Sequence, residues 1–405
     1  MNRLITATRK VWKLIVLLLL IVITFSYAMF QGGFVSWFLF YSFLPFSLYA
    51  LFLSFYSMNQ FEVKRTFHKN EFIAGESLKV TITLKRRVAF PLFYLIVEDC
   101  INNQLFFSQQ GNRSKSFVFP GFQKEFTWSY EVEKLPRGEH FFQAIRLRTG
   151  DLLGLIEKEN YIQLEDKMLV YPSYENLIYK TMENQYDQGM TASRERVQRD
   201  TSMAIGIREY QPGDRFSWIN WKATAKRNEM MTKDFEQRQS HNVYILMDCA
   251  PDRRFEAIVS FSASIIKAIL LKGAHVGFLS SASERTAFPV RGGESQQQQL
   301  FYHLAKIKDN SEVSLDRVLK VENPSLSQSN NLMLVTSQLT RSLIEVAGRF
   351  TANSAAITLF LIKSEKETIS QQELALKEAA RTRGIRVVFV HDGHFLSVFS
   401  EVAIR

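Results

Sequence analysis

The residues of this chain that are most able to do chemistry lie in one short stretch, GIREYQPGDRFSWINW, from Gly206 to Trp221. Its Arg and acidic side chains can pair through charge-assisted hydrogen bonds, which would tie a structural corner together. Its Trp and Arg side chains are also the types that dominate binding hot spots at protein interfaces. We place the structural corner first, a docking surface second and a catalytic site last, because Arg–carboxylate corners are often structural.

The order of residues predicts how this stretch folds. The sequence REY should be extended, and QPGD predicts a turn, because Pro fixes φ and Gly permits the chain to reverse. Asp214 is then placed to cap a helix that runs from Arg215 to Arg227. The sequence MMTKDFEQR, which follows, predicts a returning strand.

Side-chain positions on that helix separate an apolar face from a basic one. Trp218, Trp221 and Ala225 share one face, and the cations lie toward the other. If the corner is tied, Arg208 contacts Glu209 or Asp214. The complete set of motif residues is Arg208, Glu209, Tyr210, Pro212, Gly213, Asp214, Arg215, Trp218, Trp221, Lys222, Ala225, Lys226 and Arg227.

A second candidate site follows the apolar strand HNVYILMDC, where the chain reads MDCAPD. An Asp at this place resembles the start of a von Willebrand A-type metal site, in which Asp-x-Ser-x-Ser offers hard oxygen ligands to Mg²⁺. Here Asp248 is kept, Ala250 and Asp252 replace the two Ser, and Thr-Ser-Gln at 336–338 replaces a second Asp. We therefore expect no cofactor, with Asp248 and Asp252 as the candidates that remain for a degenerate Mg²⁺ site. Alternatively, Asp248 caps a helix or ties a loop.

Other kinds of chemistry have no local signature in this sequence. There is no Gly-rich phosphate-binding loop, no His-Cys metal cluster and no nucleophile elbow. Cys100 and Cys249 lie far apart in apolar runs, which predicts reduced thiols and no disulfide. The formal charge is +10, but the C-terminal region has no basic stripe interleaved with aromatics, so we expect no nucleic-acid partner.

Two apolar runs near the N-terminus predict a membrane hairpin. Leu14–Phe30 and Phe34–Tyr56 contain no charged residue and approach the roughly 20 residues that a helix needs to cross a bilayer. Lys and Arg flank the hairpin on both outer sides, which predicts a multi-pass protein of the cell membrane, in contact with membrane lipid, with both termini cytoplasmic. A cleaved signal peptide is the rival, but a second span follows at once. The flanking cations are Arg3, Arg9, Lys10, Lys13, Lys64, Arg65 and Lys69.

The rest of the chain contains two regions that differ in their pattern of apolar residues. After the hairpin, runs of alternating residues such as SLKVTITLKRR predict an all-β, sandwich-like domain. From His241, apolar strands alternate with helical segments, which predicts an α/β doubly wound, mostly parallel sheet. We divide the chain into a transmembrane helical hairpin (1–58), a β-sandwich-like domain (59–175), a linker and signature region (176–240) and a von Willebrand A-like α/β domain (241–405).

The long motif GIREYQPGDRFSWINWKATAKRNEMMTKDFE resembles the signature of the domain-of-unknown-function 58 family of bacterial proteins. The sequences LPRGEH, RTGDLLGLIEK and VYP, together with the N-terminal helix pair, are also similar to that family. The resemblance implies a membrane-anchored accessory protein with a degenerate von Willebrand A-like region. It further implies a MoxR-type AAA+ ATPase as partner, with a transglutaminase-like membrane protein as another, and a chaperone-like or complex-maturation role.

These observations favour a non-enzymatic, membrane-anchored accessory or scaffold protein whose α/β region binds protein partners. The alternative is a membrane-associated hydrolase that acts on cell-envelope precursors. Strongly shifted carboxylates in a deep pocket would favour the enzyme, whereas a shallow, filled crevice at the strand ends would favour the scaffold.

Overall fold

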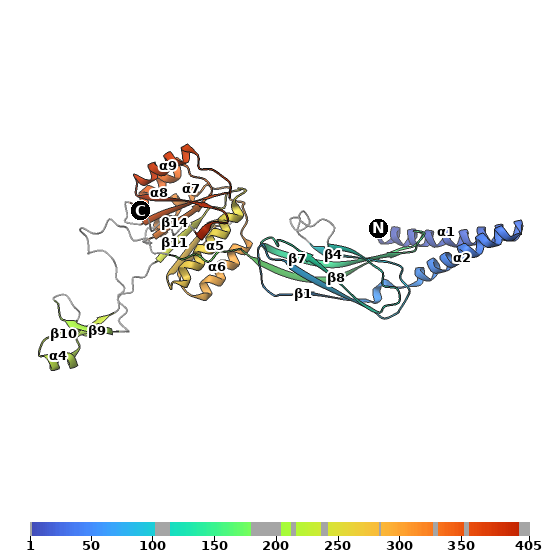
Figure 1. Ribbon diagram of the computed structural model, residues 1–405, viewed down its shortest axis with the longest axis horizontal. Coiled ribbons are helices and arrows are strands. Elements are labelled where there is room, and N and C mark those ends of the chain that lie inside the picture. Colours follow the sequence, from blue (N-terminus) through green and yellow to red (C-terminus); the bar gives the residue numbers. More distant parts are fainter. Residues whose placement is uncertain are drawn as a thin grey trace. The chain divides into compact units, whose positions relative to one another are not determined.

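The computed structural model describes residues 2–101, 114–179, 204–211, 216–235, 242–282, 285–326, 331–351 and 356–396. The chain forms two compact units, Met1–Tyr171 and Pro172–Arg405 (Figure 1). The first contains two long helices and two β-sheets. The second contains a six-stranded sheet with helices and a small two-stranded sheet.

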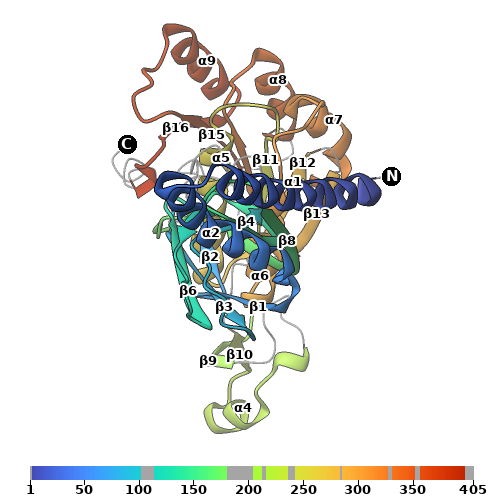
Figure 2. The same cartoon turned by 90° about the vertical axis from the view of Figure 1, so that its right-hand side faces the viewer.

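Two apolar helices begin the chain, α1 (Asn2–Gln31) and α2 (Phe34–Phe55), drawn in dark blue in Figure 2. Both contain segments long and apolar enough to cross a membrane, and little of that apolar surface is buried inside the protein. Gly32 and Gly33 connect them with φ angles of 62° and 86°, which Gly adopts without the strain that a Cβ would cause. The predicted pair of apolar helices is confirmed, and its passage through a membrane stays a prediction.

The β-sheets of the first unit share one hydrophobic core. The strands are β1 (Phe61–Phe67), β2 (Phe72–Ile73), β3 (Leu78–Arg86), β4 (Leu95–Ile101), β5 (Lys115–Val118), β6 (Glu125–Val132), β7 (Gly138–Gly150) and β8 (Glu157–Tyr171). One sheet has the order β1-β3-β6 and the other β2-β8-β7-β4-β5. In β3, Leu78, Val80 and Ile82 are fully buried and the residues between them are not, because successive side chains point to opposite faces.

Arg65 is not a surface charge beside the membrane, as the flanking-charge argument assumes. It lies in β1 with its side chain 0% exposed, and it pairs with Asp99 and Asp166 at 2.6 Å each. A guanidinium enclosed in this way cannot act on lipid headgroups. Lys64 and Lys69, which were grouped with it, are exposed.

The second unit is built on a sheet with the order β13-β12-β11-β14-β15-β16. Its strands are β11 (Asn242–Met247), β12 (His275–Ser281), β13 (Arg285–Arg291), β14 (Asn331–Thr336), β15 (Ala356–Lys363) and β16 (Ile385–His391). Neighbouring strands are parallel except for β13, which is antiparallel to β12 at one edge. The α/β sheet expected from the alternating pattern is therefore present.

Helices cover both faces of this sheet. They are α5 (Phe255–Leu271), α6 (Glu294–Lys306), α7 (Leu315–Leu326), α8 (Arg341–Thr351) and α9 (Gln371–Arg381). Helices α5 and α6 pack against each other, and α7, α8 and α9 pack over a core that contains Leu246, Leu334 and Leu359. Phe261 of α5 contacts Phe360 on the opposite face. The segment after β8 also belongs here, since Glu175 N donates to Ser264 Oγ of α5 at 2.9 Å.

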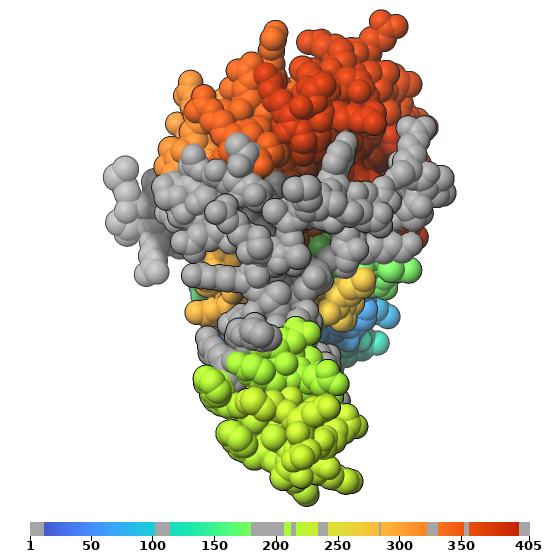
Figure 3. All heavy atoms as spheres, turned by 90° about the vertical axis from the view of Figure 1, so that its left-hand side faces the viewer, coloured from blue at the N-terminus to red at the C-terminus, as the bar shows by residue number. Residues whose placement is uncertain are grey.

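The motif stretch forms a small element of its own, drawn in yellow-green in Figure 3. It consists of β9 (Ala204–Glu209), a 3-10 turn η4 (Phe216–Trp218), α4 (Trp221–Arg227) and β10 (Met231–Phe235). Strands β9 and β10 are antiparallel, with Arg208 opposite Thr232. The expected extended segment and returning strand are both present.

Candidate functional site

The carboxyl ends of β11 and β14 border the crevice where a ligand of such a sheet would bind. Strand β11 lies between β12 and β14, so the strand order reverses there, and open α/β sheets bind ligands at this switch point. Asp248 directly follows β11, and Thr336 is the last residue of β14. Thr336 Oγ1 donates to Asp248 Oδ2 at 2.6 Å, and Ala250 N donates to Asp248 Oδ1 at 3.0 Å. Both carboxylate oxygens of Asp248 are therefore engaged in holding the loop.

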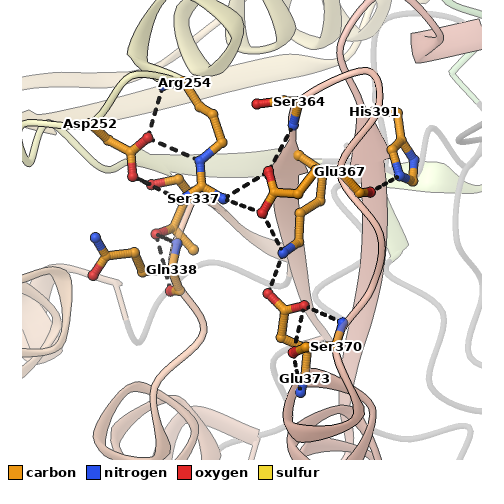
Figure 4. Close-up of polar contacts among 11 residues, drawn as sticks. Asp252, Arg254, Ser337, Gln338, Ser364, Glu367, Ser370, Glu373 and His391 are labelled. Carbon is orange, nitrogen blue, oxygen red and sulfur yellow. Dashed lines mark hydrogen bonds and ion pairs between the residues drawn. The ribbon is translucent and has the colours of Figure 1, made fainter.

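Asp252 is bound more fully still (Figure 4). Its Oδ1 accepts from the backbone N and the Nε of Arg254, at 2.8 and 2.9 Å, and its Oδ2 accepts from Arg254 Nη2 and Ser337 Oγ, at 2.9 and 2.8 Å. These hydrogen bonds from Arg254 hold the pKa of the Asp252 carboxyl well below its usual range, against the opposing effect of burial. Asp252 is thus the ionised partner of a guanidinium at neutral pH.

The network continues across the crevice to β15 and α9. Arg254 Nη1 donates to Glu367 Oε1 at 3.2 Å, and Lys363 Nζ donates to the same oxygen at 2.9 Å. Lys363 also donates to Glu373, which forms a capping box with Ser370 at the start of α9. Burial favours a lower pKa for Lys363, but its two carboxylate partners outweigh that effect and raise it.

These residues do not fit a divalent cation. Mg²⁺ requires several oxygen ligands that are free to turn toward it. Here the oxygens of Asp248 and Asp252 accept bonds from groups within the protein, and the charge of Arg254 lies where it would repel a cation. Among the described residues there is also no group of three or more His, Cys, Asp and Glu side chains able to hold a metal.

The motif element departs from the predicted helix. The helix begins at Trp221 and not at Arg215, because Asn220 is its N-cap and accepts from Ala223 N at 3.3 Å. Residues 216–218 form a 3-10 turn before it. The expected cap, Asp214, and its neighbours Pro212, Gly213 and Arg215 lie outside the described residues.

The two Trp residues consequently have different environments. Trp218 is half-buried and precedes the helix, whereas Trp221 is 67% exposed, so they do not form one face with Ala225, which is exposed as well. The structure therefore does not form the apolar face that was expected of Trp218, Trp221 and Ala225. The element is held instead by buried Ile219, Met231 and Thr232, with Met231 O accepting from Asn220 N at 2.8 Å.

Several motif residues remain at the surface. Lys222, Lys226 and Arg227 are exposed on α4, and Phe216, which the sequence analysis did not single out, is 73% exposed and stacks on Tyr210. Arg208 Nη1 donates to the backbone O of Glu209 at 3.0 Å, which is a contact with the main chain and not with the Glu209 carboxylate.

Sequence comparison agrees with the motif. The model of the family described as "Protein of unknown function DUF58" matches residues 206–391. The "Uncharacterized protein YeaD" of Bacillus subtilis (strain 168) is 40% identical over 385 residues, which cover 94% of this chain and 96% of that protein. The chain belongs to the DUF58 family.

The DUF58 match includes both places described above, the motif element and the strand ends of the α/β sheet. Among solved structures, this DUF58 chain is similar to the SpRpn10 VWA domain, with 14% identity and a TM-score of 0.27, over 40% of this chain and 92% of that one. It is also similar to BslA, a bacterial hydrophobin, with 12% identity and a TM-score of 0.19, over 27% of this chain and 98% of that one.

Sequence reasoning missed most of the strand-end network in this DUF58 protein. It singled out Asp248 and Asp252, but not Arg254, Lys363, Glu367 or Glu373. The sequence did contain one usable signal. Arg254 lies two positions after Asp252, close enough for its guanidinium to pair with that carboxylate in place of a metal ion. No local signal links Arg254 to Glu367, because 113 residues separate them.

Proposed function

We propose that this protein is a membrane-anchored, non-enzymatic accessory protein that binds a protein partner through a docking face on the motif element. The docking face consists of Phe216, Trp221, Lys222, Lys226 and Arg227. The observation that carries the proposal is the exposure of Trp221 and Phe216 beside three cations. Trp and Arg are the residues that most often dominate binding at interfaces, and exposed aromatics beside charges are typical of such sites.

The chemistry of the docking face favours an acidic partner surface with an apolar recess. Three exposed cations attract carboxylates and speed association, and a Trp side chain gains most when it fills a pocket. A MoxR-type AAA+ ATPase is the partner that we propose, with a transglutaminase-like membrane protein as a further member of the assembly. The helices α1 and α2 would hold the protein in the cell membrane, with both termini in the cytoplasm.

The strand-end crevice supports the scaffold over the hydrolase. A general acid needs a raised pKa, but Asp252, Glu367 and Glu373 have lowered pKa values. Burial is the largest single effect and favours a higher pKa for the two Glu, but hydrogen bonds from Lys363 and from backbone N–H groups, with the nearby positive charge, together outweigh it. These three carboxylates are therefore engaged as counter-ions of Arg254 and Lys363.

The test is purification of partners from native membranes solubilised in detergent. The full-length chain is compared with the triple variant Lys222→Glu, Lys226→Glu and Arg227→Glu, and with Trp221→Ala, and co-purifying proteins are identified by mass spectrometry. The matched control, Lys320→Glu, Lys366→Glu and Arg386→Glu, changes the charge equally at exposed sites outside the motif. We expect the ATPase to be lost from both docking-face variants and kept by the control. If the ATPase co-purified with every variant, the docking face would be contradicted. If it did not co-purify with the wild type, the proposed partner would be contradicted.

A further inference from the structure

One end of the β-sheets of the first unit carries a group of exposed apolar side chains, which we call the apolar rim. They come from three loops, which connect β3 to β4, β5 to β6, and β7 to β8. Between 46% and 74% of each residue is exposed. The apolar rim consists of Val88, Phe93, Phe119, Phe122, Leu152 and Leu153.

Strand pairing places the three loops at the same end. Leu95 at the start of β4 pairs with Val118 at the end of β5, and Gly150 of β7 pairs with Glu157 of β8. Leu92 and Gly121 form a bridge between the first two loops. The apolar rim is thus one region of the surface and not a set of scattered residues.

This end of the sheets is also the end that meets α2. The rings of Tyr49 and Phe93 lie 4.5 Å apart, and Phe93 N donates to Tyr49 Oη at 3.4 Å. Lys158 Nζ donates to Ser54 O in the last turn of the helix at 2.7 Å. Because Tyr49 lies six residues before Phe55, the loop that holds Phe93 extends about 9 Å back along the helix. It therefore runs beside the apolar segment and not beyond it.

Buried polar groups hold these loops in fixed shapes. Arg86 donates to Phe90 O, Gly121 O and Gln123 O at 2.6 to 2.7 Å, which fastens two of the loops to each other. In the third, the Asp151 carboxylate accepts from the backbone N of Leu153 and of Ile156 at 3.1 and 2.5 Å. The exposure of the apolar rim is therefore built into the fold, since its loops cannot turn inward without breaking these bonds.

We propose that the apolar rim lies in the headgroup region of the lipid bilayer that α2 enters, so that the β-sheets are seated on the membrane. This proposal rests on the membrane anchoring that is part of the proposed function. Aromatic side chains are enriched at this depth of a bilayer, and an exposed apolar patch of this kind marks a place of contact. Arg87 and Arg148, exposed at the same end, supply cations for anionic headgroups.

The position of the apolar rim beside α2 indicates that lipid is what contacts it. A helix of α2's length spans the hydrocarbon core, so a loop that lies beside Tyr49 is at the level of the lipid and not of bulk water. The same lipid that covers the apolar surface of α2 then covers the apolar rim. Contact with lipid fixes the β-sheets to the bilayer at a second place, in addition to the chain connection at Tyr56.

The test uses the full chain in phosphatidylcholine vesicles, with a fluorescent label on single Cys residues in a Cys100→Ser, Cys249→Ala background that keeps the wild-type melting midpoint. The vesicles contain lipid brominated near the carboxyl end of the acyl chain, which quenches labels at shallow depth. Phe122→Cys and Leu153→Cys report on the apolar rim. Phe141→Cys is the matched control, an exposed Phe at the other end of β7, about 27 Å from Thr149 along the strand. Phe30→Cys on α1 reports on the anchoring itself.

We expect the labels at positions 30, 122 and 153 to lose fluorescence in brominated vesicles and the label at 141 to keep it. Quenching at 30 without quenching at 122 and 153 would overturn the seating proposal and leave the anchoring intact. Loss of quenching at 30 would overturn the anchoring and, with it, the proposal. Equal quenching at 122 and 141 would also contradict the proposal, because the contact would then not be specific to the apolar rim.

Discussion

Each unit of the protein contains an ion network centred on one Arg, and the two networks differ in what surrounds them. Arg65 binds Asp99 through two hydrogen bonds, of 2.6 and 3.1 Å, and the side chains of both residues are 0% exposed. Arg254 binds Asp252 in a similar way, but it lies at the edge of the sheet with its side chain 19% exposed. Tyr130 completes the first network by donating to Asp99 at 2.8 Å.

The difference shows how the same pairing serves two purposes. In the interior of the β-sheets, charges must be paired because water cannot reach them, so the Arg65 network is a requirement of the fold. At the strand ends Arg254 is partly exposed, so desolvation forces its pairing less than it does for Arg65, although Lys363 of the same network is buried. The Arg254 network instead joins the charged side chains at these strand ends to one another, at the place where open α/β sheets usually bind a ligand.

The largest effect expected from this comparison is that of Asp99→Ala. The change leaves Arg65 buried with Asp166 as its remaining charged partner, and removing one member of a buried ion pair costs about 3–5 kcal/mol of folding free energy. Hydrogen exchange of peptides from β4 and β6 would measure the loss in the full chain. Glu62→Ala is the control, since its bridge to Arg87 is exposed and is expected to contribute less than about 1 kcal/mol. Equal effects of the two substitutions would mean that burial does not decide the difference.

A smaller loss is expected from Arg254→Ala. Water can replace part of the lost interaction at the strand ends, so we expect a cost of about 1.5–3 kcal/mol, typical of hydrogen bonds to charged groups. Hydrogen exchange of β11 and β14 would report it. A double-mutant cycle with Asp252→Ala should show coupling, because either change breaks the same pair. Additive losses would contradict the geometry of the pair.

Lowering the pH should reduce the contribution of the Arg254 network to folding stability, and it should not reduce the contribution of Asp99 in the Arg65 network. The pKa values of Asp252, Glu367 and Glu373 are lowered in the folded chain, so their contribution is present above the unfolded pKa and is lost as the pH falls through the folded one. Burial raises the pKa of Asp99, with Arg65 and Tyr130 opposing it, so its contribution is lost as the pH rises. Between about pH 5 and pH 3, near ordinary carboxyl pKa values, peptides of the strand ends should lose protection.

The measurement is hydrogen exchange at matched intrinsic exchange times, with β14 compared with β4 in the same sample. The variant Asp252→Asn removes one of the titrating groups and should flatten the pH dependence at β14. If β14 and β4 lost protection in parallel, the two networks would not differ in the way that the structure indicates.

The extent to which sequence predicted these features depends on how local they are. The alternation in Leu78–Arg86 was sufficient for β3, and the helical segments expected among the apolar strands after His241 include α5. Strand β8 is harder to recognise, because residues 157–164 alternate exposed with half-buried side chains and have no continuous apolar run. Strand β13 and helix α7 were missed, and α7 contains Pro324, a residue that normally argues against a helix.

The candidate sites, too, could be predicted only where they depend on residues that are close in sequence. Asp248 could be placed from its position after an apolar strand, since that depends on a few neighbouring residues. The helix of the motif began later than expected because Asp214 and Asn220 are both suitable caps, and local propensity does not choose between them. The Arg254–Glu367 pair could not be foreseen, since it depends on β11 and β15 ending at the same edge of the sheet.

The smallest effect is expected when metal ions are added or removed. An unchanged melting midpoint would support the absence of a Mg²⁺ site at the strand ends. A ligand that binds the folded state alone stabilises it by about 2.7 kcal/mol at a concentration 100 times its Kd, so a Mg²⁺ site at the crevice would raise the melting midpoint measurably. Because Arg254 already neutralises Asp252 and Thr336 donates to Asp248, we expect millimolar Mg²⁺ or a chelator to leave that midpoint unchanged. Arg254→Ser removes the internal cation and frees Asp252, so it is the variant in which a response to Mg²⁺ can appear. A rise in the wild type that Asp252→Ala abolished would show that the guanidinium does not exclude the ion, and the strand-end crevice would then be a ligand site after all.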